Sequence, residues 1–278
     1  MFKDRRLIIA TKHHKEHVIA PLLEQELGVK CFIDETFDTD TLGTFSGEVQ
    51  REQDPLSTAR LKCLKAMECN NCDLGVASEG SFGPHPSLFF ASADDEFLIF
   101  IDKKNDLEIV VRELSTETNF NGKAISSENE LMAFADLIKF PSHALILKPS
   151  KENIEDMVKG ITDFQDLKTA FQDIIEKHGE IYAETDMRAM FNPSRMAVIE
   201  AAAKKLVAKI KSSCPKCKTP GFGVTDTKTG LPCDLCGMPT ASIKALVYQC
   251  KKCAYTLEKA PPHGKTTEDP TYCDFCNP

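Results

Sequence analysis

The residues whose spacing is most specific for chemistry are eight cysteines near the C-terminal end of the sequence, arranged as four Cys-x-x-Cys pairs. Two intervening residues let both thiolates of a pair reach one metal ion, and two pairs complete a tetrahedral Cys₄ site. No spacing typical of an iron–sulfur cluster is present. We therefore predict two structural zinc ions. Their predicted ligands are Cys214, Cys217, Cys233, Cys236, Cys250, Cys253, Cys273 and Cys276.

The four Cys-x-x-Cys pairs can bind the two zinc ions in two arrangements. The gaps of 15 residues after Cys217 and 19 residues after Cys253 are both typical of zinc ribbons. We expect pairs that are neighbours in sequence to share a metal, and interleaved sharing is the alternative. A fifth pair, Cys69 and Cys72, has no partner pair. We interpret it as two buried or half-buried thiols, with a redox switch or a further metal site as alternatives.

Residues 9–16 are a first candidate phosphate-binding segment. An apolar strand pattern ends there in a polar loop with Lys12 and Lys15, and Thr11 is expected to cap a helix that stops at Gly28. A helix N-terminus with adjacent lysines suits phosphate, and a solvated helix start is the alternative. His13 and His17 lie four residues apart, a spacing that can share a metal on a helix, but we favour the interpretation that they lie on a solvated face.

Residues 78–86 are a second candidate. They follow an apolar strand pattern at 74–77 and read as a Gly/Pro-rich loop with hydroxyls, the carboxylate of Glu79 and the imidazole of His85. Loops at the carboxyl ends of strands form the sites of open α/β sheets, so we expect function to concentrate here, with a structural turn as the alternative. Glu79 is accordingly expected at the end of a strand.

Acidic and basic residues elsewhere could complete such a site. The polar segment 37–51 contains two aspartates and Glu48, whose oxygen atoms could bind Mg²⁺, or it is a surface loop. Residues 184–196 place two acids and two arginines beside a predicted helix start. Arg188 could there bind phosphate through bidentate hydrogen bonds, or the segment is a salt-bridged joint.

The elements that must position these residues fall into three regions. Residues 1–148 alternate strand and helix patterns, with a helix after Asp54-Pro55 and a hairpin at 97–111, which indicates an α/β domain with a mixed sheet and the candidate active site. Residues 149–212 are predicted to be a helical connector. Residues 213–278 are predicted to be a double zinc ribbon.

Charge and composition limit the partners. The 278 residues carry a formal charge of −8, but residues 201–278 hold twelve lysines and six acids, a charge of +6. Eight thiolates with two Zn²⁺ add −4 and leave about +2, so the support for nucleic-acid binding is weak. No secretory signal or membrane-spanning run is apparent, and twelve cysteines fit metal binding in a reducing compartment. We expect a cytoplasmic protein without membrane contact.

Nearly the whole chain resembles an uncharacterised bacterial protein family of unknown function that ends in zinc ribbons. This resemblance implies no activity. It is carried by Ala10-Thr11, Lys15-Glu16, Asp38-Thr39-Asp40, Gly43-Thr44-Phe45, residues 78–86, Asp186-Met187-Arg188-Ala189, residues 192–196 and Cys276-Asn277-Pro278.

Residues 7–114 also resemble, in the order of their motifs, the inosine/xanthosine triphosphate pyrophosphatases. The first shared feature is the segment 9–16, in which a strand is followed by Ala-Thr, a polar loop, a lysine and the start of a helix. The acidic Glu48 and a helix that contains Ala59-Arg60 come next. The last shared feature is the segment 75–80, where a strand ends in an acidic residue and a glycine. The sequence departs from that pattern at His14, where an asparagine is usual, and in the extension 82–86.

Together these observations predict a metal-dependent phosphohydrolase that acts on a phosphate ester or anhydride, with nucleotides among the candidates. Glu48 and Glu79 would hold Mg²⁺ or Mn²⁺, Lys15 would neutralise phosphate, and His85 would act as an acid, a base or a ligand. The expected substrate contacts are Lys12, Ser78, Gly80, Ser81, Gly83 and Arg188. The alternative is a non-catalytic protein that senses a small ligand and binds a protein or nucleic acid through its zinc ribbons.

Overall fold

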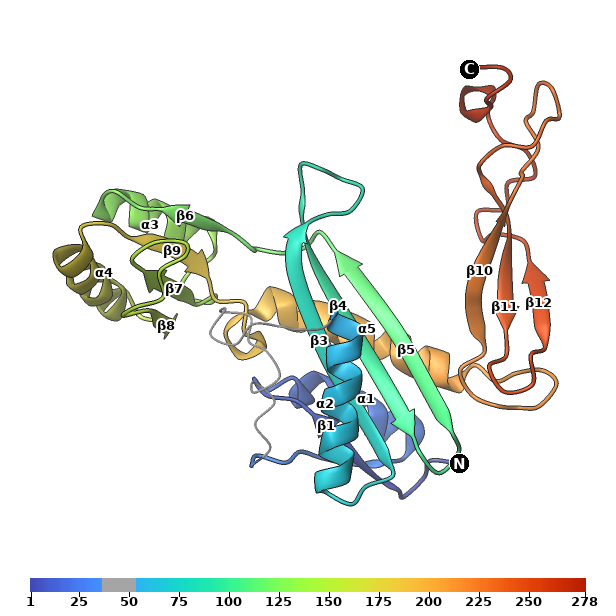
Figure 1. Ribbon diagram of the computed structural model, residues 1–278, viewed down its shortest axis with the longest axis horizontal. Coiled ribbons are helices and arrows are strands. Elements are labelled where there is room, and N and C mark those ends of the chain that lie inside the picture. Colours follow the sequence, from blue (N-terminus) through green and yellow to red (C-terminus); the bar gives the residue numbers. More distant parts are fainter. Residues whose placement is uncertain (37–53) are drawn as a thin grey trace. The chain divides into compact units, whose positions relative to one another are not determined.

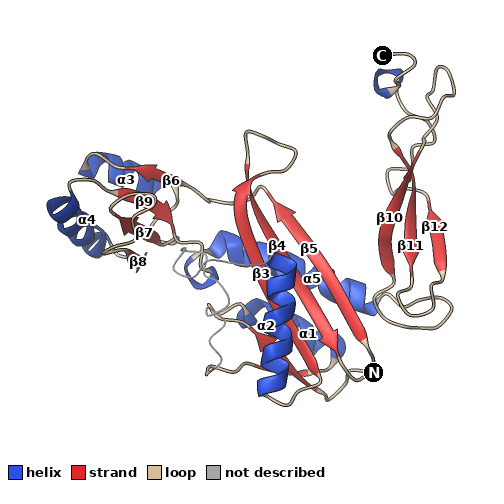
Figure 2. Cartoon of the chain, viewed as in Figure 1, coloured by secondary structure: helices blue, strands red, loops and turns tan. Residues whose placement is uncertain are grey.

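The computed structural model describes residues 1–36 and 54–278. It divides into two compact units, unit 1 (Met1–Val207) and unit 2 (Ala208–Pro278). The expected mixed α/β class is confirmed by the elements of unit 1 (Figures 1 and 2). The expected division at residues 148 and 212 stays a prediction.

A five-stranded sheet forms the centre of unit 1, in the order β2-β1-β3-β4-β5. β1 pairs in parallel with β2 and β3, whereas β4 and β5 are antiparallel, so the predicted hairpin is confirmed and makes the sheet mixed. The strands are β1 (Arg6–Ala10), β2 (Lys30–Phe32), β3 (Leu74–Pro84), β4 (Ser92–Asp102) and β5 (Leu107–Ser115).

Helix α1 (Glu16–Leu27) follows β1 and begins later than the Thr11 cap predicts. The reason is that His13 and His14 have φ angles of 69° and 60°, which form a left-handed turn before the helix. The predicted stop is confirmed, because Gly28 has a φ of 67° and its N–H donates to the carbonyl of Glu24.

Helix α2 (Pro55–Cys69) begins as the Asp54-Pro55 signal predicts, and the Asp54 carboxylate accepts a hydrogen bond from the Ser57 N–H. One face of this helix packs on the sheet, and its Cys63 and Met67 lie in a core that includes Ile8 of β1. The helix therefore covers one face of the sheet. The opposite face carries the polar side chains described below.

Strand β3 differs from the sequence prediction because it does not end at residue 77. Residues 78–84 continue the strand and pair with residues 92–98 of β4. Several of their side chains are polar and buried, which in sequence suggests a loop. In the structure these side chains face charged partners, and the antiparallel partner strand satisfies the backbone groups.

Unit 1 also holds a four-stranded sheet in the order β6-β9-β7-β8, packed with helices α3 and α4 around a shared core. The Ser127 cap of α3 and the predicted span of α4 are confirmed, but the region expected to be helical also contains β8 and β9. Such four-residue strands are recognisable only through their pairing. The elements are β6 (Gly122–Ala124), α3 (Glu128–Leu137), β7 (Leu145–Lys148), β8 (Val158–Ile161), α4 (Phe164–His178) and β9 (Tyr182–Thr185).

The chain then enters a short 3₁₀ helix, η2 (Ala189–Phe191), and the long helix α5 (Pro193–Lys211), which begins after Asn192 as predicted. Unit 2 consists of a three-stranded antiparallel sheet in the order β10-β11-β12, with cysteine-containing turns. Its elements are β10 (Gly223–Thr229), β11 (Ile243–Gln249), β12 (Thr256–Lys259) and the 3₁₀ helix η3 (Pro270–Tyr272).

Candidate functional site

Two groups of four cysteines in unit 2 have the geometry that a tetrahedral metal requires. The first centre comprises Cys214, Cys217, Cys250 and Cys253, and the second centre comprises Cys233, Cys236, Cys273 and Cys276. Sulfur atoms from different pairs lie 3.6 to 3.8 Å apart. A ZnS₄ tetrahedron with bonds of about 2.3 Å has edges of about 3.8 Å. Both centres can therefore bind zinc.

The pairing expected for these cysteines is wrong, and the interleaved alternative is correct. The cause is the topology of the sheet. β10 and β11 are antiparallel, with Gly223 opposite Gln249, so the pair before β10 meets the pair after β11. The pair after β10 instead meets the last pair, beside a backbone bridge between Cys233 and Glu268.

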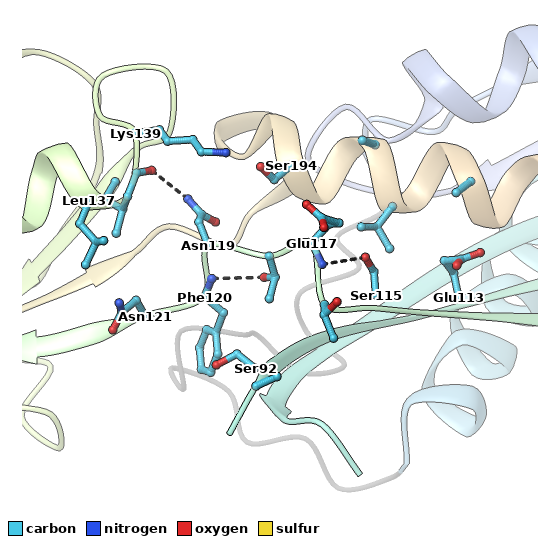
Figure 3. Close-up of a pocket in the computed structure, with 17 residues that line it drawn as sticks. Ser92, Glu113, Ser115, Glu117, Asn119, Phe120, Asn121, Leu137, Lys139 and Ser194 are labelled. Carbon is cyan, nitrogen blue, oxygen red and sulfur yellow. Dashed lines mark hydrogen bonds between the residues drawn. The ribbon is translucent and has the colours of Figure 1, made fainter. Parts of the chain in front are cut away.

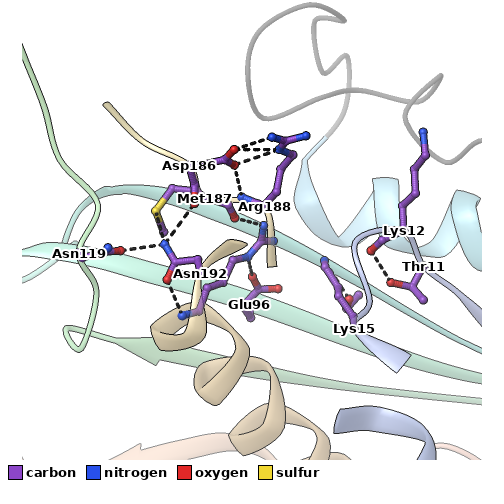
Figure 4. Close-up of polar contacts among 11 residues, drawn as sticks. Thr11, Lys12, Lys15, Glu96, Asn119, Asp186, Met187, Arg188 and Asn192 are labelled. Atoms are coloured by element: carbon purple, nitrogen blue, oxygen red, sulfur yellow. Dashed lines mark hydrogen bonds and ion pairs between the residues drawn. The ribbon is translucent and has the colours of Figure 1, made fainter. Parts of the chain in front are cut away.

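A cluster of buried charged side chains lies in unit 1, past the carboxyl end of β1. We call it the Lys15–Arg195 cluster, and it comprises Lys15, Ser78, Asp94, Glu96 and Arg195. The Lys15 Nζ donates to the Ser78 Oγ at 3.1 Å, and the Arg195 Nε donates to the Glu96 Oε1 at 2.7 Å (Figure 4). Arg195 also donates to the carbonyl of Met187. All five side chains are at most 6% exposed.

Strand pairing explains how these groups come together. Gly80 is opposite Glu96 and Phe82 is opposite Asp94, and paired residues point to the same face of a sheet. A Cβ atom at Gly80 would lie 2.2 Å from the Glu96 Oε1 and 2.7 Å from a terminal nitrogen of Arg195. Only glycine therefore leaves room for this ion pair. The Arg195 guanidinium also lies over the Phe82 ring, 4.9 Å from its centroid.

Burial within the cluster shifts the pKa values of Asp94 and Lys15. Burial, together with the charge of Glu96, raises the pKa of the Asp94 carboxyl to about 8. Burial, together with the charge of Arg195, lowers the pKa of Lys15 to about 8. Neither Asp94 oxygen nor the Glu96 Oε2 has a hydrogen-bond partner among residues 1–36 and 54–278. Buried carboxylate oxygens of this kind are costly unless a proton or a cation satisfies them.

Glu79 lies within β3 and not at a strand end as expected. Adjacent strand residues alternate between faces, so Glu79 lies on the opposite face of the sheet from Ser78, toward α2. There its Oε2 accepts from the Lys62 Nζ at 2.7 Å, and both side chains are 8% exposed. A lysine ammonium thus already occupies the position that a metal would take at this carboxylate.

The other predicted residues lie in several places. Glu48 lies outside the described residues. The Nδ1 atom of His85 accepts from the backbone N–H groups of Ser87 and Leu88, so this ring orders the turn between β3 and β4. Lys12 is exposed in the β1–α1 loop and points away from Lys15 (Figure 4). Ser81 and Gly83 are half-buried in β3, opposite Asp95 and Ala93 of β4.

Arg188 lies in the turn between β9 and η2. Its guanidinium makes a bidentate ion pair with the buried Asp186, in which Nε donates to Oδ1 and a terminal nitrogen donates to Oδ2, and it lies over the Phe191 ring. Asn192 connects this turn to the cluster, because its Oδ1 accepts from the backbone N–H of Arg195 and its Nδ2 donates to the Asn119 side chain (Figure 4). The turn therefore matches the alternative interpretation of this segment, a salt-bridged joint. The Arg188 side chain remains partly exposed, whereas Asp186 is buried.

A cavity of about 700 Å³ adjoins this connection in unit 1 (Figure 3). It lies between the segment 115–121 and α5, and Asn119 lines it on one side and Ser194 on the other. The Phe120 ring borders the cavity and packs against Phe82, at 5.8 Å between centroids. Its size matches that of small-molecule sites, and its lining mixes apolar and amide groups.

Asp94, Glu96 and Lys62 are not among the site residues predicted from the sequence. Asp94 and Glu96 precede the strand predicted to begin at residue 97, and only the observed start of β4 at Ser92 places these two acids, two residues apart, on one face of the sheet. Lys62 interrupts the apolar face of α2, one turn after Ala59 and one turn before Ala66. A lysine at such a position requires a buried counter-charge.

The fold and the two cysteine centres define a mixed α/β protein with a C-terminal Cys₄ module. The chain belongs to the family described as the domain of unknown function DUF6671, whose model matches residues 62–278. A comparison with curated proteins found no match. Within residues 1–36 and 54–278, no helix has the length and apolar character that crossing a membrane requires.

Proposed function

We propose that the chain is a metal-dependent phosphohydrolase that acts on a phosphate ester or anhydride, with nucleotides among the candidate substrates. The observation that supports this best is the pair of buried carboxylates, Asp94 and Glu96, with three oxygens that no described group satisfies. They lie past the carboxyl end of β1, the edge at which open α/β sheets bind ligands.

A divalent cation fits this pair of carboxylates. Mg²⁺ and Mn²⁺ prefer oxygen ligands, and a cation between the two carboxylates would offset the burial and the repulsion from Glu96 that together raise the pKa of Asp94. The metal ligands in this proposal are therefore Asp94 and Glu96, in place of Glu79, whose carboxylate is ion-paired with Lys62. A cation there would polarise a phosphoryl oxygen.

The residues around the carboxylates have matching roles in the proposal. Arg195 orients Glu96 through the bond from its Nε. Lys15, with its pKa near 8, can hold or release a proton near neutral pH. The cavity beside Asn119 has room for the organic part of a nucleotide, and hydrogen bonds through Asn192 couple it to Arg195.

A phosphate-release assay tests the proposal. Nucleoside triphosphates, diphosphates and monophosphates are offered to the full chain with Mg²⁺ or Mn²⁺. We expect turnover of at least one of them, and Asp94→Asn should reduce it by about 100-fold or more through loss of a metal ligand. Asp95→Asn is the matched control, since Asp95 lies on the other face and pairs with Arg112. Equal turnover in the two variants, or none with any substrate, would refute the proposal.

A second candidate function, partner binding by the Cys₄ module, is favoured by a contrast between its two centres. The turns of the second centre expose Leu235, Tyr272 and Phe275, at 74%, 65% and 66%. Aspartates 234 and 274 stand beside them. At the first centre the corresponding turns expose lysines instead, at positions 216, 218, 251 and 252. An apolar surface with acidic neighbours suits a protein segment with apolar and basic side chains and disfavours nucleic acid.

A pair of model peptides tests this second candidate. An amphipathic helix of leucine and lysine should bind the full chain, and a leucine–glutamate peptide should bind at least tenfold more weakly. Phe275→Ser should weaken binding of the lysine peptide, whereas Lys216→Ser at the first centre should leave it unchanged. Equal binding of both peptides would exclude a surface with this charge preference.

A further inference from the structure

The turn that opens α1 places three metal-ligating side chains together on the outside of unit 1. His14, Glu16 and His17 each offer one ligand atom, and these atoms lie within 4.8 Å of one another. Lys15, between them in sequence, points inward to Ser78. The three side chains therefore form a group of their own, separate from the buried cluster.

The distances fit a metal better than they fit hydrogen bonds. The Glu16 Oε1 lies 3.6 Å from the His14 Nδ1 and 3.5 Å from the His17 Nε2. Charge-assisted N–H···O bonds are shorter, at about 2.7–2.9 Å. The edges of a tetrahedron with bonds of about 2.1 Å to nitrogen and oxygen are about 3.4 Å long. The observed separations are close to such edges.

Local contacts hold the side chains near one another. The rings of His14 and His17 stack, with centroids 5.1 Å apart and planes at 17°, and rotation of one ring would bring both in-plane nitrogen lone pairs to one ion. This arrangement depends on the left-handed turn at His13 and His14, because a helix beginning at Thr11 would place His14 elsewhere. His14 and His17 are 55% and 68% exposed, so a metal ion can reach them from solvent.

We propose that His14, Glu16 and His17 form a third metal site, specific for borderline divalent ions such as Zn²⁺, Co²⁺ or Ni²⁺. Two imidazoles and one carboxylate suit these ions and are less suited to Mg²⁺. Three protein ligands leave a coordination position open to water or an anion, unlike the closed Cys₄ centres. The site does not depend on the proposed hydrolase function, and its occupancy can be measured without turnover.

Calorimetric titration of Ni²⁺ into the full-length chain, loaded with two equivalents of zinc, tests the site. With zinc in both Cys₄ centres and excess Mg²⁺ present to fill the proposed site at Asp94 and Glu96, the third site is the expected acceptor, so we predict one equivalent of bound Ni²⁺. His17→Ala and Glu16→Gln should each weaken binding by at least about tenfold, since even outer-shell changes lower metal affinity about 10–100-fold. His263→Ala, a change at an exposed histidine of unit 2, should leave it unchanged.

The same titration separates the alternatives. Loss of binding in His17→Ala but not in Glu16→Gln would show only a surface histidine pair and would overturn the three-ligand site. Equal binding in all variants would overturn the site entirely. Asp94→Asn should not alter Ni²⁺ binding, so failure of the hydrolase proposal would not be mistaken for failure of this one. Unchanged circular dichroism in each variant would confirm that the fold is intact.

Discussion

Asp94→Asn should stabilise unit 1 by an amount that grows with pH. Asp94 has a pKa of about 8 in the folded chain and about 3.9 in an unfolded one. Between these values the folded state binds more protons than the unfolded state, so the wild-type free energy of unfolding falls as pH rises. The free energy of unfolding of the wild type falls by about 1.4 kcal/mol per pH unit in this range. The Asp94→Asn variant does not show this fall at position 94, because asparagine is neutral in both the folded and the unfolded state. The expected advantage of Asp94→Asn is roughly 1–2 kcal/mol at pH 5 and roughly 3–5 kcal/mol at pH 7.

Urea unfolding followed by circular dichroism measures this difference, because the α-helices lie mainly in unit 1. The experiment uses metal-free buffers without a chelator, which keeps zinc at the cysteine centres and divalent ions away from Asp94. A difference of about 4 kcal/mol is a large part of the stability of an ordinary domain. It corresponds to a rise in Tm of about 8–16 °C for a unit of this size.

Asp95→Asn is the control for this measurement. Asp95 forms an ion pair with the half-exposed Arg112, so its loss should change stability by about 1 kcal/mol or less. An Asp94→Asn difference that is flat with pH would refute the reasoning. A destabilised variant would likewise show that the Asp94 carboxylate is satisfied in the folded chain.

Three further changes test other parts of the structure. Gly80→Ala should destabilise unit 1 by about 1–3 kcal/mol through overpacking, whereas Gly83→Ala, with no atom within 4 Å of the added Cβ, should be nearly neutral in the same urea assay. Lys62→Met should cost about 3–5 kcal/mol because it removes one partner of a buried ion pair, and a double-mutant cycle with Glu79 should show strong coupling. Metal analysis should find two zinc ions per chain, and the double variant Cys233→Ser/Cys273→Ser should lose one; loss of both would contradict the interleaved pairing.

The parts of the structure that could be predicted from sequence are those set by local chemistry. The cysteine pairs, the Asp54-Pro55 helix start and the Gly28 stop each depend on a few adjacent residues, and each was found as predicted. The mixed sheet followed from the hairpin near residue 103. In each case the signal and the structure occupy the same short stretch of chain.

The remaining features depend on contacts between distant residues. Residues 78–84 read as a loop because buried polar side chains are unusual in strands, and the charged groups that bind Ser78 and Glu79 are Lys15, just before α1, and Lys62 of α2. The metal pairing depends on the antiparallel order of β10 and β11, which Cys-x-x-Cys spacing does not encode. Among the candidate site residues, Lys15 and Ser78 do meet, whereas Glu79 faces the other side of the sheet and His85 orders its own turn.

Counting bound Mn²⁺ with electron paramagnetic resonance measures whether Asp94 and Glu96 hold a divalent cation. The zinc-loaded wild type should bind one more Mn²⁺ per chain than Asp94→Asn, while Asp95→Asn should match the wild type. Any Mn²⁺ bound at other positions remains in all three proteins and cancels. Equal counts in the wild type and Asp94→Asn would contradict the claim, because the buried carboxylates would then be satisfied by protons alone.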